Sequence, residues 1–136
     1  MMTQEELIEK AKSVVRPKKV GDFTNGDVGC ALETEQGNVY LGVCIEVICG
    51  MGFCAEHSAI AAMVTAGEYR IKTIVAVCIV DQETYILSPC GRCREFMHQI
   101  DEANLDTDVI LDVGKALKLA ELLPYDSWFH KVGSGE

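Results

Sequence analysis

Two short motifs of this chain contain residues that could carry out chemistry together. Cys54 and Glu56 flank an alanine just after a glycine-containing stretch, and a proline precedes the Cys90-x-x-Cys93 pair. A Cys-x-x-Cys pair within one helical turn places both sulfur atoms on the same side, where they can share a metal ion. A third thiolate from Cys54 would give zinc three ligands and leave its fourth position open for water, as in a catalytic site.

Each motif stands at the predicted start of a helix, one over about Cys54–Ala66 and the other over about Cys90–Ile100. The N-terminus of a helix carries unpaired N–H groups and a partial positive charge, which lower the pKa of a thiol and stabilise the thiolate. Glu56 is too close in sequence to Cys54 to bind the same ion easily, but it can reach a water on that ion. The pattern therefore predicts Glu56 as a general acid and base.

The Cys-x-x-Cys spacing also occurs in redox pairs and in structural zinc sites, so a non-catalytic module that binds a partner is the alternative. A redox pair would leave Cys54 and Glu56 without a role. A structural zinc site would need a fourth ligand, for which Cys49 and His57 are the candidates. Because His57 directly follows Glu56, it points about 100° away from it on a helix. We expect the catalytic site.

Composition restricts the class of protein. The 136 residues are 49% hydrophobic, which suits a single domain spanning residues 1–136 with a core of its own. No apolar run reaches the roughly 18 residues of a membrane span, and the acidic N-terminus does not resemble a signal peptide. We therefore expect a cytoplasmic protein that does not enter a membrane.

The charge balance predicts a small ligand. Only 12 basic residues stand against 21 acidic ones, and the formal net charge is −9. A protein that grips a nucleic acid polymer gains affinity through Lys and Arg, so such a partner is not expected. The odd total of seven cysteines does not suggest a disulfide framework. Those outside the two motifs are expected to be small buried hydrophobes: Cys30, Cys44, Cys49 and Cys78.

The elements that must position the motifs follow from hydrophobic periodicity. A further helix is predicted over Gln4–Val15, and residues 21–27 have the composition of a loop. The segment Lys115–Leu123 has helical propensity and could include a short strand. Strands are predicted over Val28–Thr34, Val39–Ile48, Ile71–Val80 and Asp108–Val113. This alternation predicts an α/β fold with helices packed on a mixed sheet.

The two motifs together resemble the cytidine deaminase family in its small, three-cysteine form. The matching residues are Cys-Ala-Glu at 54–56 and Ser-Pro-Cys-Gly-x-Cys-Arg at 88–94, and the resemblance extends over roughly Val28–Pro124. It implies a five-stranded mixed sheet with helices on both faces, in three layers. It also implies homotetramers with shared active sites and a role in pyrimidine salvage.

The resemblance further implies one zinc ion per chain, held by Cys54, Cys90 and Cys93, which activates a water. Glu56 would pass protons from that water to N3 and to the departing amine of a cytosine nucleoside, cytidine or deoxycytidine, releasing ammonia. Ala55 and Ser88 would line the pocket for the base.

The sugar end of the substrate site departs from the family. The family's Asn-x-Glu is here Cys44-Ile45-Glu46, so Glu46 could accept a sugar hydroxyl whereas the Cys44 thiol is a weak donor and acceptor. Phe23 is a displaced candidate for a substrate wall. Trp128, with Phe129 beside it, is a candidate for stacking on the base.

Two further residue patterns bear on the substrate. His57 occupies a position where the family often has Arg, whose charge balances the thiolates; a histidine does this only when protonated. The Cys-Arg-Glu sequence at 93–95 is similar to the end of the same motif in blasticidin S deaminase. An antibiotic or another modified cytosine is therefore the alternative substrate.

Overall fold

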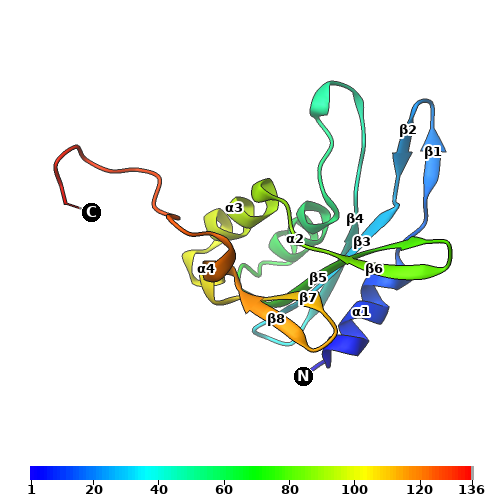
Figure 1. Ribbon diagram of the computed structural model, residues 1–136, viewed down its shortest axis with the longest axis horizontal. Coiled ribbons are helices and arrows are strands. Elements are labelled where there is room, and N and C mark those ends of the chain that lie inside the picture. Colours follow the sequence, from blue (N-terminus) through cyan, green and yellow to red (C-terminus); the bar gives the residue numbers. More distant parts are fainter. Residues whose placement is uncertain (136) are drawn as a thin grey trace.

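The computed structural model describes residues 1–135 and shows a mixed sheet with helices on both faces (Figure 1). The α-helices are α1 (Gln4–Ser13), α2 (Ala55–Thr65), α3 (Gly91–Ile100) and α4 (Leu119–Leu122). The strands are β1 (Lys18–Val20), β2 (Phe23–Asn25), β3 (Val28–Thr34), β4 (Val39–Val43), β5 (Ile71–Val80), β6 (Glu83–Leu87), β7 (Asp108–Asp112) and β8 (Lys115–Lys118). Short 3₁₀ helices cover Ile48–Gly50 (η1) and Glu102–Asp106 (η2).

The main sheet has the strand order β4-β3-β5-β7-β8, and β6 also pairs with β5. Strands β5 and β7 run parallel, with α3 in the connection between them, whereas the other pairs in this sheet are antiparallel. The fold class is therefore as predicted, but the sheet has six strands rather than five. The additional strand β6 forms a hairpin with β5 through Asp81 and Gln82, which both have positive φ. A two-residue turn of this kind usually contains Gly or Asn. This turn has neither, so the sequence gives only a weak signal for the hairpin.

Two other segments differ from the predictions. Residues predicted as a loop around 21–27 include β2, which pairs with β1 in a separate hairpin. The segment predicted as helix over Lys115–Leu123 is a strand, β8, followed by the single turn of α4. The predicted strand Val39–Ile48 ends at Val43, because η1 and an isolated bridge between Ile45 and Phe53 follow.

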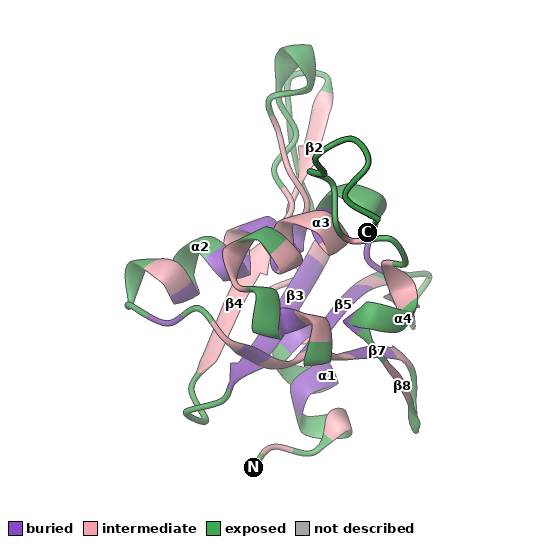
Figure 2. Ribbon diagram, turned by 90° about the vertical axis from the view of Figure 1, so that its left-hand side faces the viewer, coloured by how far each residue is buried: buried purple, intermediate pink, exposed green. Residues whose placement is uncertain are grey.

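The sheet is covered on both faces (Figure 2). Helix α1 packs Leu7 and Ala11 on one face, against alternate residues of β3 and β5 such as Ala31 and Val75. The intervening residues of these strands point to the other face, toward α2 and α3. Burial on both faces explains why β3 and β5 read as almost continuous apolar runs rather than as alternating ones.

Helix α2 lies close to β4 because the facing residues are small, as the many alanines of the helix predict. A Cβ atom at Gly42 would overlap the backbone nitrogen of Ala59. The Ser58 hydroxyl also donates a hydrogen bond to the Val43 carbonyl, at 2.7 Å. This close contact fixes α2, and with it the first motif, against the sheet.

The chain after α4 leaves the body of the molecule as an extended segment (Figure 1). None of the helices in residues 1–135 combines the length and the apolar character needed to cross a bilayer.

Candidate active site

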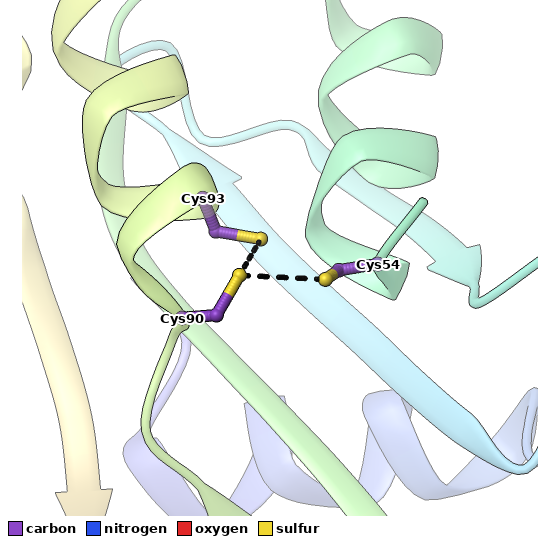
Figure 3. Close-up of side chains that lie close together, drawn as sticks. All are labelled: Cys54, Cys90 and Cys93. Carbon is purple, nitrogen blue, oxygen red and sulfur yellow. Dashed lines mark hydrogen bonds between the residues drawn. The ribbon is translucent and has the colours of Figure 1, made fainter. Parts of the chain in front are cut away.

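The three motif cysteines converge where α2 and α3 begin (Figure 3). Cys54 is the N-cap residue of α2 and Cys90 is the N-cap residue of α3, and both have extended backbone angles. Cys93 lies one turn into α3 and is fully buried. The Sγ atom of Cys90 lies 3.5 Å from that of Cys54 and 3.5 Å from that of Cys93.

This arrangement fits a tetrahedral zinc ion. Three sulfur ligands at the usual Zn–S length would be about 3.8 Å apart, and the three sulfur atoms here all lie within 4.8 Å of one another. Within residues 1–135, no His, Asp or Glu side chain joins these three cysteines. The cluster is therefore positioned to bind one metal ion and to leave one coordination position to water.

The pKa values of the three thiols also favour the binding of a cation. Burial raises the pKa of Cys54 and of Cys93, and the neighbouring Cys90 and Glu56 add to these shifts. Burial also acts to raise the pKa of Cys90, but hydrogen bonds with the N–H group of Cys93, with the thiols of Cys93 and Cys54 and with the N–H group of Arg92 outweigh it, so this pKa is lowered. The predicted helix-end effect therefore holds for Cys90 but not for Cys54. A divalent cation removes the obstacle to ionising all three thiols.

Neither candidate for a fourth ligand belongs to the cluster. Cys49 is exposed on η1. His57 is buried and stacks on Phe96 with ring centroids 4.2 Å apart, and its Nδ1 atom lies 3.4 Å from the Cys93 sulfur. Burial, and then the nearby Arg92, lower the pKa of His57. Its imidazole therefore offers the thiolate a hydrogen bond rather than a permanent charge.

Glu56 is the one acid of the first turn of α2, and its side chain is 5% exposed. Burial raises the pKa of this carboxyl, while hydrogen bonds from its own N–H and from Cys93 act in the opposite direction. Such a shift is typical of a carboxyl group that exchanges protons during a reaction.

A cavity of about 250 Å³ opens beside these residues. Its walls combine a few polar groups with small apolar side chains, which is the usual character of a site for a small organic ligand. The residues that line it are Val28, Cys44, Cys54, Ala55, Glu56, Ala76, Leu87, Ser88 and Cys90. Cys44, Ala55 and Ser88 are thus brought together with the cysteine cluster.

Three residues predicted to bind substrate do not line this cavity. Glu46 is exposed, and its backbone N–H donates to the Asn25 side chain at 2.7 Å. Phe23 is half-buried in β2. Trp128 is 68% exposed on the C-terminal segment. Their roles stay predictions.

Two features of the site were not predicted. The Cys44 thiol donates to the Asp27 carboxylate, with Sγ and Oδ1 2.8 Å apart. Of the four cysteines predicted to be buried hydrophobes, Cys30 is fully buried, Cys44 and Cys78 are half-buried, and Cys49 is exposed. Leu87 reaches the cavity from β6, the strand that sequence reasoning missed.

A metal site with a free coordination position next to a buried carboxyl group of raised pKa is the arrangement of a zinc-dependent hydrolase. Residues 1–105 match the cytidine and deoxycytidylate deaminase zinc-binding region. The chain therefore belongs to the cytidine and deoxycytidylate deaminase family, and it is a zinc-dependent hydrolytic deaminase.

Comparison with individual proteins supports this family assignment. The chain is 37% identical over 106 residues to a blasticidin-S deaminase of Bacillus cereus, covering 71% of this chain and 74% of that protein. It is 33% identical over 100 residues to a cytidine deaminase of Mycobacterium tuberculosis, covering 71% and 69%. A solved structure of cytidine deaminase from M. tuberculosis matches the fold with a TM-score of 0.77 at 22% identity, covering 95% of this chain and all of that one.

The metal centre can be tested by replacing single cysteines with serine. We expect the wild-type protein to contain one zinc per chain by elemental analysis, and Cys54→Ser to lose most of it, because a hydroxyl is a poor zinc ligand at neutral pH. Cys49→Ser is the matched control, since Cys49 is exposed and lies outside the cluster. Loss of zinc from Cys49→Ser would instead indicate a closed, structural site.

Proposed function

We propose that this deaminase converts the 4-amino group of a cytosine nucleoside, cytidine or deoxycytidine, to a carbonyl and releases ammonia. The observation that carries this proposal is the cavity that Glu56 lines together with Cys54 and Cys90. Family membership supports the same reaction. The net charge of −9 favours a small nucleoside over a nucleic acid polymer.

In this proposal Glu56 carries the protons. Cys54, Cys90 and Cys93 would hold the zinc ion, which would supply the Lewis acidity that makes water a nucleophile at neutral pH. The Glu56 carboxylate accepts a proton from the attacking water and delivers it to N3 of the base. It then takes the proton of the hydroxyl newly formed on C4 and passes it to the amino group as the bond from C4 to nitrogen breaks, which leaves the carbonyl and ammonia. Its raised pKa suits both steps, because a carboxyl that holds a proton closer to neutral pH can both accept it and return it.

Glu56→Gln tests this role, because the amide keeps the size of the side chain but cannot move a proton. We expect kcat to fall by about 10²-fold to 10⁴-fold, with zinc content and circular dichroism unchanged. Ammonia release by the purified variant is the measurement. A variant that still releases ammonia at the wild-type rate contradicts the mechanism.

The sugar end of the cavity favours a second candidate substrate. The Cys44 thiol already donates to Asp27, so this wall offers no strong donor to a ribose hydroxyl. The relative from Bacillus cereus is a blasticidin-S deaminase, at 37% identity. A cytosine antibiotic of the blasticidin S type is therefore the alternative substrate.

Comparison of kcat/KM for cytidine, deoxycytidine, free cytosine and blasticidin S separates the two candidates. We expect cytidine or deoxycytidine to be preferred by the wild type. Cys44→Asn should raise kcat/KM for cytidine by about 2-fold to 10-fold, the value of one new hydrogen bond. Free cytosine has no sugar and serves as the control. Preference of the wild type for blasticidin S would establish the alternative.

We also propose that the chain works as a cytoplasmic homotetramer in pyrimidine salvage. The family resemblance supports this assembly, and so do the aromatic side chains of the C-terminal segment. Trp128 is 68% exposed and Phe129 is 83% exposed, with ring centroids 5.7 Å apart. Light scattering should give the mass of four chains, and Trp128→Ser with Phe129→Ser should give a smaller species. A wild-type protein with the mass of one chain contradicts the proposal.

A further inference from the structure

Arg94, on the first turn of α3, makes three directed hydrogen bonds to two separate segments of the chain. Its Nε atom donates to the Pro89 carbonyl at 2.8 Å, and its Nη2 atom donates to the Ser88 hydroxyl at 3.1 Å. Its Nη1 atom donates to the Leu122 carbonyl at 2.9 Å. The planar guanidinium thus bridges the segment before α3 and the end of α4.

This position is unusual for a cation. The N-terminal turn of a helix carries a partial positive charge, which disfavours a neighbouring Arg or Lys. Side chains of a helix lean toward its N-terminus, so the guanidinium of Arg94 reaches back past Cys90 to the residues before the helix. The hydrogen bonds to its three acceptors offset the unfavourable interaction of the guanidinium with the helix dipole. The last of them, Leu122, ends α4, where a carbonyl without a helical partner is a natural acceptor for Arg.

The bonded groups lie where they can shape the substrate site. Ser88 lines the cavity, and Pro89 directly precedes Cys90. Leu122 is the point from which the C-terminal segment departs. We propose that Arg94 is a positioning residue that joins the cavity wall at Ser88 to the C-terminal segment at Leu122, and that it holds the pocket in the shape that binds the base. This inference rests on the proposed function.

The geometry specifies which kinetic constant depends on Arg94. Zinc would be held by the thiolates of Cys54, Cys90 and Cys93, so it should stay bound when the guanidinium is lost. The wall at Ser88 then has to be ordered each time a substrate binds, and this cost falls equally on the bound substrate and on the transition state. Loss of such uniform binding raises KM and leaves kcat almost unchanged. A lysine retains the charge but cannot donate in three fixed directions.

Arg94→Lys therefore tests the inference. We expect one zinc per chain, an unchanged circular dichroism spectrum, a KM for cytidine raised about tenfold and a kcat lowered less than threefold. Ser88→Ala should raise KM less, because it removes one of the three bonds. The double variant should be no worse than Arg94→Lys alone, since the two side chains act as one unit.

Arg70→Lys is the matched control. Arg70 also donates to a backbone carbonyl and to side chains, those of Asn104 and Thr107, but it precedes β5 beyond the opposite end of α2. We expect this variant to lose stability and to keep the wild-type KM. A wild-type KM in Arg94→Lys, or an equal rise of KM in Arg70→Lys, would overturn the inference.

A second measurement separates this inference from the proposed function. Trp128 is the single tryptophan of the chain and lies on the C-terminal segment, so its fluorescence anisotropy reports the order of that segment without any substrate. The anisotropy should fall in Arg94→Lys but not in Arg70→Lys. If the wild type deaminates no cytosine compound, the proposed function is wrong. The anisotropy of Trp128 still tests whether Arg94 orders the C-terminal segment. An unchanged anisotropy in Arg94→Lys would then overturn its role.

Discussion

The site depends on bringing three thiols to one point, where a bound cation favours the ionisation of all three. Burial raises the pKa of Cys54 and Cys93, and the N–H groups at the start of α3 lower only that of Cys90. The rest of the fold brings the two cysteine motifs together. Close packing at Gly42 holds the start of α2 against the sheet. The strand β6 leads the chain directly to Ser88 and Cys90 at the start of α3, so the two motifs meet although they lie far apart in sequence.

The same convergence places a buried carboxyl group, that of Glu56, beside the metal site. Glu56 is buried because it belongs to the first turn of a helix whose N-cap residue is Cys54, so one short motif provides both groups. Around it the cavity is lined mostly by small or apolar residues, which suits a planar base. Two polar side chains on its wall are held by hydrogen bonds from behind: Cys44 bonds to Asp27, and Ser88 bonds to Arg94. The first departs from the family pattern, and the second is part of the motif that defines the family.

The sequence was most informative where residue spacing determines geometry. The Cys-x-x-Cys pair and the Cys-Ala-Glu motif predicted the cluster, and the long apolar runs predicted β3 and β5 with the bounds observed. Prediction failed where tertiary pairing decides the local conformation. The turn at Asp81 and Gln82 lacks the usual glycine, so β6 was missed, and β8 forms because β7 offers it a partner. Contacts between distant residues, such as those of Arg94 with Leu122, leave no periodic signal in one sequence.

The parts of the chain that hold the metal have a consequence for how the protein folds. Cys54 and Cys90 are 36 residues apart, and α2, β5 and β6 lie between them. Metal capture therefore closes a long loop, and the entropy of that closure has to be supplied by the pairing of the intervening strands before three ligands can act together. In the unfolded chain, only ligands close in sequence, such as Cys90 and Cys93, are near one another. Zinc binding is therefore expected to stabilise the native topology in which the two motifs have already met, rather than to direct the chain toward it.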